Sequence, residues 1–167
     1  HVVHAINAAR DAVRSARGGI DGPRYILEGQ QGLYAATCKN PKPMSFSDQW
    51  WIHDVSFKPW GACRHAHPVI DAALALKNKL GTLDGKIDIE TYKDAIIFCD
   101  RPDPKSVIDA KFSLQHAAAV VAERGEPELA DFEPDVVASL AVRRSQVTVS
   151  EAPEITARYP EHYGARI

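Results

Sequence analysis

The chain has 167 residues, of which 45% are apolar and 25% charged, a composition typical of a soluble globular domain. Its net charge of −2 gives no general attraction for nucleic acid or anionic membranes, and no apolar run is as long as a membrane span. Cys38, Cys63 and Cys99 are odd in number and far apart. We interpret them as free thiols in a reducing compartment and expect a cytoplasmic protein.

The first third of the chain is predicted to contain two helices. Apolar residues recur every three or four positions from Val2 to Arg17, and Gly18-Gly19 ends this helix. A shorter helix is expected over 31–38, followed by a loop over 39–47. Residues 48–57 indicate a strand or extended segment.

The remaining chain is predicted to mix helices with short strands. Helices with a regular apolar spacing are expected over 68–80, 106–124 and 134–142. A single helical turn is expected over 88–91. Strands are expected over 94–99, 145–149 and 164–167. This pattern predicts an α+β fold, with a small, mostly antiparallel sheet and helices packed on one of its faces.

Residues 58–68, which we call the basic segment, concentrate the chemically active side chains. Its ionisable or nucleophilic members are Lys58, Cys63, Arg64, His65 and His67. Pro68 suits the first position of the following helix, whose unpaired N–H groups add positive potential. The basic segment is therefore predicted to bind a small polycarboxylate, with His65 or His67 acting as acid or base near neutral pH.

Three other interpretations of the basic segment stay open. Cys63, His65 and His67 could ligate a metal, although this spacing matches no common zinc arrangement and Arg64 disfavours a cation. Cys63 beside histidine could be a nucleophile, but no orienting Asn or Asp is evident from local spacing. The segment could also be a cluster of surface cations.

His116 forms a weaker candidate site. It shares a predicted polar stripe of the helix over 106–124 with Asp109 and Ser113. A histidine in such a position is usually solvated.

Four stretches of the sequence resemble the MmgE/PrpD family, which includes 2-methylcitrate dehydratase, cis-aconitate decarboxylase and iminodisuccinate epimerase. They occur in family order and are Gly22-Pro23 with Leu27-Glu28-Gly29, Phe57–Ala73, Ala110–His116 and Tyr159–Arg166. Trp60-Gly61 replaces the usual Tyr-Pro pair, which changes the predicted pocket wall.

The resemblance implies a two-domain enzyme with a large helical domain and a smaller α+β lid. Residues 1–40 would lead in from the helical domain, and residues 41–167 would form the lid, truncated at its C-terminal end. Both ends look interrupted, and the family's principal Asp and His would precede His1. The family implies no cofactor and no metal, a small polycarboxylate substrate, the helical domain as a partner, and a homodimer without nucleic-acid or membrane partners.

The resemblance also implies roles for individual residues. Lys58 matches the signature lysine and His67 a signature histidine, so these two are the predicted catalytic residues. The predicted substrate-binding residues are Cys63, Arg64, His65 and His116, the last standing where many members have Tyr. The expected activity is that of a lyase resembling 2-methylcitrate dehydratase, with the fragment alone inactive. The alternative is a non-catalytic carboxylate-binding or interaction module.

Overall fold

The structure, a computed structural model, describes residues 1–42, 48 and 50–167. The chain divides into two compact units, residues 1–55 and 56–167. Within the described residues, no helix is both long and apolar enough to cross a membrane.

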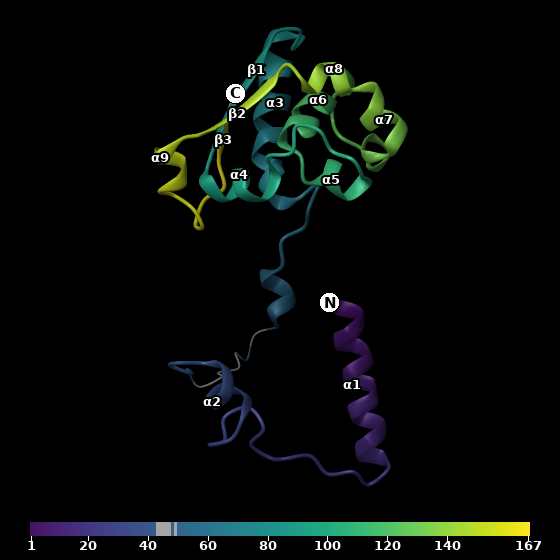
Figure 1. The fold of residues 1–167 in the computed structure, drawn as a ribbon, viewed down its shortest axis with the longest axis vertical. Coiled ribbons are helices and arrows are strands. Elements are labelled where there is room, and N and C mark those ends of the chain that lie inside the picture. Colours follow the sequence, from purple (N-terminus) through teal and green to yellow (C-terminus); the bar gives the residue numbers. More distant parts are fainter. Residues whose placement is uncertain (43–47, 49) are drawn as a thin grey trace. The chain divides into compact units, whose positions relative to one another are not determined.

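Within its described residues, the first unit contains the α-helices α1 (Val2–Arg17) and α2 (Leu33–Thr37) (Figure 1). Helix α1 has the predicted bounds and is followed by Gly18, whereas α2 is shorter than predicted. The predicted strand or extended segment over 48–57 is confirmed only in part: Trp50 and Val55 have extended backbones, but Trp51–Asp54 between them form a 3₁₀ turn, η1. Residues 43–47 of the predicted loop lie outside the described residues.

The second unit contains a three-stranded sheet in the order β2-β1-β3. The strands are β1 (Ile87–Thr91), β2 (Val147–Glu151) and β3 (Ala165–Arg166). The α+β class is confirmed, but the prediction of a mostly antiparallel sheet is wrong. The five-residue pairing of β1 with β2 is parallel, and only the shorter pairing with β3 is antiparallel. The long helical connection between β1 and β2 makes the parallel pairing possible.

The sheet has one apolar and one polar face because its strands alternate. In β1, Ile87 and Ile89 are buried while Asp88 is exposed. On the polar face, the Thr148 hydroxyl donates to the Asp88 carboxylate at 2.5 Å. This division is the one expected for a sheet that is covered by helices on one side.

The helices of the second unit surround a core between α3, α6 and the sheet (Figure 1). The α-helices of this unit are α3 (His67–Leu80), α4 (Lys93–Cys99), α5 (Val107–Lys111), α6 (Leu114–Arg124), α7 (Pro134–Ser139), α8 (Ala141–Arg144) and α9 (Pro153–Thr156). Two 3₁₀ helices, η2 (Arg64–Ala66) and η3 (Leu129–Phe132), lie between them or before them. The buried apolar residues of the α-helices include Val69, Ile70, Leu114 and Val121. Gly81 and Gly125, with φ of +85° and +94°, end α3 and α6 in the conformation that glycine adopts without strain.

In two adjacent segments, the predicted type of secondary structure was wrong: a predicted helical turn is a strand, and a predicted strand is a helix. The predicted helical turn over 88–91 belongs to β1, whose buried positions alternate with a period of two. The predicted strand over 94–99 is helix α4, in which the buried residues Ala95 and Cys99 are four positions apart. A short apolar run does not distinguish a buried strand from a helix, so the packing against neighbouring elements decided.

The helix predicted over 106–124 is two helices. Ser106 accepts a hydrogen bond from the Asp109 amide at 3.1 Å and begins α5, while Ser113 accepts one from the His116 amide at 3.0 Å and begins α6. Each serine therefore acts as an N-cap. The break rotates α6 relative to the predicted stripe, so Ser113 and His116 are buried rather than solvated.

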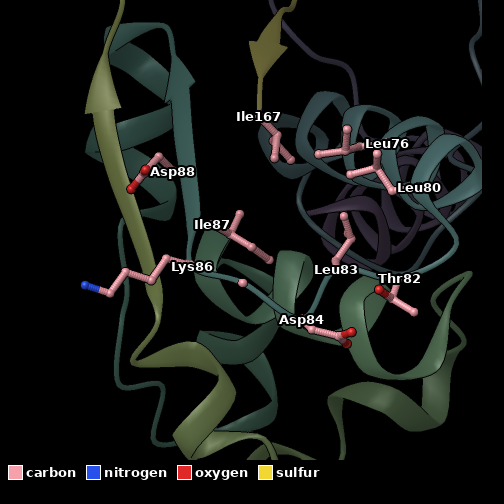
Figure 2. A pocket seen from close by; sticks show the side chains of 10 residues that line it. Leu76, Leu80, Thr82, Leu83, Asp84, Lys86, Ile87, Asp88 and Ile167 are labelled. Carbon is pink, nitrogen blue, oxygen red and sulfur yellow. The ribbon is translucent and has the colours of Figure 1, made fainter.

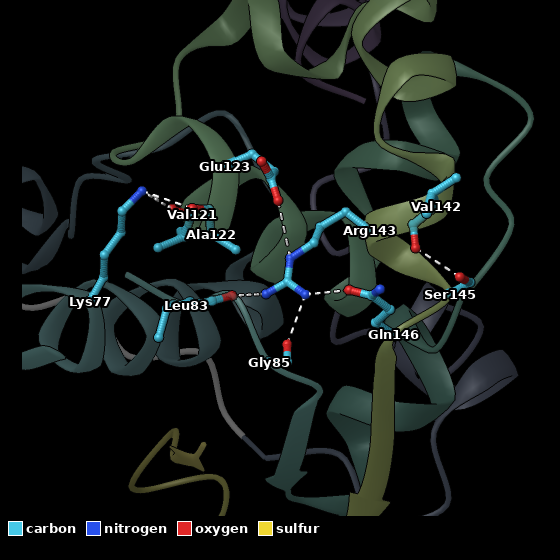
Figure 3. A network of polar contacts seen from close by, with 10 residues as sticks. All are labelled: Lys77, Leu83, Gly85, Val121, Ala122, Glu123, Val142, Arg143, Ser145 and Gln146. Carbon is cyan, nitrogen blue, oxygen red and sulfur yellow. Dashed lines mark hydrogen bonds and ion pairs between the residues drawn. The ribbon is translucent and has the colours of Figure 1, made fainter. Parts of the chain in front are cut away.

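The loop between α3 and β1 is bound by Arg143 of α8 (Figure 3). Its guanidinium donates to the carbonyl oxygens of Leu83 and Gly85, the latter at 2.8 Å. It also donates to the Gln146 side chain at 2.6 Å and lies 3.3 Å from the Glu123 carboxylate. A single buried side chain thus connects the loop, α6 and α8.

Candidate active site

The basic segment is held in place by backbone contacts on both sides. The Cys63 amide donates to the Lys111 carbonyl at the end of α5, at 2.7 Å. Helix α3 then begins at His67, so the N-cap residue is Ala66 and Pro68 is the second helical residue. The helix start was thus predicted within one residue, and the proline occupies a position where its missing N–H is not needed.

Lys58 and His67 share one backbone acceptor, the Ala62 carbonyl. The Lys58 ammonium lies 3.5 Å from this oxygen, and Nε2 of His67 lies 3.4 Å from it. Because a carbonyl oxygen only accepts, Nε2 of His67 carries the proton and Nδ1 has a free lone pair. The structure thus brings the two predicted catalytic residues together.

His67 is a buried, neutral imidazole. It is 1% exposed, and its Nδ1 has no hydrogen-bond partner within the described part of the chain. Burial lowers the pKa of His67, and the hydrogen bond to the Ala62 carbonyl is the largest effect that opposes it. The charges of Arg64 and Lys58 lower this pKa further, while Asp71 raises it. At neutral pH the imidazole can therefore accept a proton, although it does not face solvent.

The buried Trp60 packs against His67. The two ring centroids are 5.3 Å apart with the planes tilted by 59°, and the indole N–H donates to the Glu126 side chain at 3.2 Å. The position at which the family resemblance implies a tyrosine is thus occupied by another aromatic ring. Trp60 also ties the segment to the loop after α6.

The His65 ring belongs to an aromatic cluster, and Arg64 lies against this cluster. Its members are His65, Tyr92, Phe98, Tyr159 and Tyr163. Nδ1 of His65 lies 2.7 Å from the Tyr92 hydroxyl, and its ring stacks on Phe98 at 5.1 Å with only 9° between the planes. The exposed Arg64 guanidinium lies 5.5 Å from the centroid of the Tyr163 ring. Burial lowers the pKa of His65, and Asp94 opposes this effect.

Cys63 is half-buried and packs beside the buried Cys99 of α4. Burial and the neighbouring Cys63 thiol raise the pKa of Cys99. The three side chains of the metal interpretation therefore diverge, with Cys63 on Cys99, His65 on Tyr92 and His67 on Trp60. Among residues 1–42, 48 and 50–167, no three His, Cys, Asp or Glu side chains are grouped as metal ligands.

His116 lies apart from the basic segment in its contacts. Its side chain is 0% exposed, and Nε2 donates to the Asp131 carbonyl at 2.8 Å. Nδ1 lies 3.5 Å from the Arg144 guanidinium and accepts from it. Burial lowers the pKa of His116 against the raising effect of the Asp131 carbonyl. Both ring nitrogens are thus occupied by protein partners.

Sequence reasoning missed the aromatic cluster around His65. Its members come from the end of β1, from α4 and from the turn before β3, so they are distant in sequence. Tyr159 and Tyr163 were noted only as part of a family-like stretch. No periodic pattern links these positions to the basic segment, and only the packing of the chain brings them together.

A hollow lies at the end of α3 that is away from the basic segment, beside the start of β1 (Figure 2). It has a volume of about 320 Å³, and its apolar lining includes Leu76, Leu80, Leu83 and Ile167. It contains no residue of the basic segment. We therefore do not include it in the candidate site.

Comparison with known proteins identifies the second unit. Residues 60–167 match the MmgE/PrpD C-terminal domain, so the match begins two residues after Lys58 and includes residues 60–68 of the basic segment. None of the curated proteins matches the chain. The family is enzymatic, and membership implies its dehydratase or decarboxylase chemistry without specifying a substrate. Since the match covers more than half of the sequence, the chain belongs to the MmgE/PrpD family and contains its C-terminal domain.

Proposed function

We propose that this domain is the lid of a cofactor-independent lyase or isomerase that acts on small di- or tricarboxylates. The expected reaction is dehydration of 2-methylcitrate by proton abstraction next to a carboxylate. The resemblance implies that a helical domain supplies the opposite wall of the active site, and that the enzyme is a homodimer. The domain by itself is then expected to be inactive.

The observation that most supports this proposal is the convergence of Lys58 and His67 on the Ala62 carbonyl. An exposed ammonium held in this way offers a fixed positive charge to a substrate carboxylate or to the negative charge that develops on proton abstraction. The exposed Arg64 guanidinium adds a second donor without any need for deprotonation.

The burial of His67 supports a positioning role for this residue. Its contacts are the Trp60 ring and the Ala62 carbonyl that Lys58 also approaches. His67 therefore orients Lys58 through a shared acceptor, while Lys58 contacts the substrate. The half-buried Cys63, which packs beside Cys99, would line the substrate pocket. His116 would act on the substrate only indirectly, through the packing of α6.

The test uses a protein that carries this domain together with its helical domain. Solvent deuterium exchange at the carbon next to a carboxylate, followed by proton NMR, reports proton abstraction whether the later step is dehydration, decarboxylation or epimerisation. Lys58→Ala is expected to lower the exchange rate at least a hundredfold, in line with the loss of one general catalytic group.

The matched control is Lys79→Ala, which removes an exposed lysine from the last turn of α3. It is expected to leave the rate of exchange unchanged. Equal rates for Lys58→Ala and the wild type, at unchanged stability, would remove Lys58 from the active site.

A non-catalytic carboxylate-binding module is the second candidate, favoured by the compactness of residues 56–167 as a unit of their own. Calorimetry with citrate on the isolated chain separates the two candidates. Tight binding without the helical domain supports a module, whereas its absence supports a lid that needs the opposite wall.

A further inference from the structure

The contact between Tyr92 and His65 determines which nitrogen of His65 a ligand meets. Tyr92 follows β1 directly and is 0% exposed. Its hydroxyl oxygen lies 2.7 Å from Nδ1 of His65, which is a short and well-formed hydrogen bond. Within the part of the chain that the structure describes, Nε2 of His65 has no protein partner.

The buried hydroxyl of Tyr92 is the donor in this bond. A buried O–H group without an acceptor is costly, and Nδ1 of His65 is the acceptor available to it. Burial together with Tyr163 and Tyr159 raises the pKa of Tyr92, so its phenol keeps its proton at neutral pH. Nδ1 must then offer its lone pair, and the imidazole proton resides on Nε2.

The aromatic cluster fixes the orientation of the His65 ring. Phe98 stacks on it, and the Tyr163 ring lies 5.7 Å away by centroid distance. The Arg64 guanidinium lies over the same Tyr163 ring, in a cation–π contact. The Arg64 guanidinium and the His65 ring therefore border the same aromatic ring. Within the described residues, no protein acceptor is hydrogen-bonded to the Arg64 guanidinium or to Nε2 of His65, and Asp94 is the carboxylate whose charge acts on His65.

We propose that Tyr92 is a positioning residue that holds His65 as the Nε2–H tautomer, so that His65 binds a substrate carboxylate as a hydrogen-bond donor beside Arg64. This inference rests on the proposed function for its ligand, and it assigns His65 to binding rather than to proton abstraction. A carboxylate accepts from a neutral imidazole N–H and a guanidinium at once, whereas a base at this position would need a free lone pair on Nε2.

The first test is independent of any substrate. Long-range ¹H–¹⁵N NMR of the labelled full chain at neutral pH distinguishes a protonated ring nitrogen from an unprotonated one. We expect Nδ1 of His65 to be unprotonated and Nε2 to be protonated. In Tyr92→Phe, which keeps the ring but lacks the hydroxyl, part of the population should move to the Nδ1–H tautomer. A protonated Nδ1 in the wild type, or an unchanged tautomer in Tyr92→Phe, would overturn the inference.

The second test uses turnover of 2-methylcitrate by a protein that includes the helical domain. The amide N–H of His65→Gln can reach the place of Nε2, whereas that of His65→Asn lies near Nδ1. We expect KM to rise about threefold in His65→Gln and about tenfold or more in His65→Asn, as for a lost hydrogen bond to a charged group, with kcat changing less. Equal increases in KM for the two variants would exclude a donor role at Nε2.

The two tests also separate the inference from the proposed function. If the wild type turns over no carboxylate, the proposed function fails while the NMR experiment still determines the tautomer. If turnover is normal and Nδ1 carries the proton, the function stands and the role of Tyr92 is refuted.

Discussion

Replacing Arg143 with methionine tests how the second unit is held together. Methionine has a similar length and no hydrogen-bond donors, so it keeps much of the packing and removes the contacts in Figure 3. Arg143 is 6% exposed and donates to two carbonyl oxygens and one side-chain oxygen. The loss should therefore exceed that of an ordinary surface arginine.

The magnitude follows from what each partner does when the guanidinium is absent. Leu83 is buried, so its carbonyl would lose its partner at a cost of about 1–3 kcal/mol. Gly85 is exposed and its carbonyl can bind water instead. Glu123 is half-exposed, so its ion pair contributes little. We expect Arg143→Met to reduce the free energy of unfolding by about 2–3 kcal/mol.

Urea denaturation followed by circular dichroism measures this free energy. Arg143→Lys should recover only part of the loss, because one ammonium cannot reach all three acceptors in the geometry of a planar fork. The exposed Arg158→Met provides the control and should change stability little. A loss below about 0.5 kcal/mol for Arg143→Met would refute the assigned role, since that is the range of ordinary surface substitutions.

Two further predictions concern α6. Because burial lowers the pKa of His116 below its usual value of about 6.5, the unfolded chain takes up a proton before the folded one does. Stability should therefore fall as the pH drops below 7, and the urea midpoint of His116→Gln should depend less on pH between 7 and 5; an equal dependence would contradict this explanation. Ser113→Ala removes the N-cap of α6 and a 2.6 Å hydrogen bond from the Ser113 hydroxyl to the Arg101 carbonyl. We expect it to lower the free energy of unfolding, measured by urea denaturation, by about 1–2 kcal/mol. The control Ser139→Ala, at an exposed serine, should lower it by less than about 0.5 kcal/mol.

The basic segment shows how much of a candidate site can be predicted from consecutive residues. Residue types alone single out Lys58 and Arg64 as candidates, and Pro68 predicts the start of the helix, which the structure confirms within one residue. The predicted role of His65 as an acid or base was less specific, because the tautomer of an imidazole depends on its partners. Its partner Tyr92 is 27 residues away and could not be recognised from local spacing.

His116 illustrates the opposite outcome. Its spacing from Asp109 and Ser113 is that of one helical stripe, yet Ser113 ends that regularity by capping a new helix. A serine within a helical pattern is compatible with either a continuous helix or a break, since its hydroxyl competes for backbone partners. The packing of α6 against α3 decided in favour of the break and buried the histidine.

The sequence by itself determined the α+β class, the bounds of α1 and α3 and the position of the basic segment, because apolar periodicity, Pro68 and the terminal glycines act locally. Only the tertiary structure decided which short apolar runs became strands and that β1 and β2 are parallel. It alone brought Tyr92 to His65 and His67 to Trp60. These features depend on contacts between distant residues, and the burial that stabilises them exists only once the chain has packed.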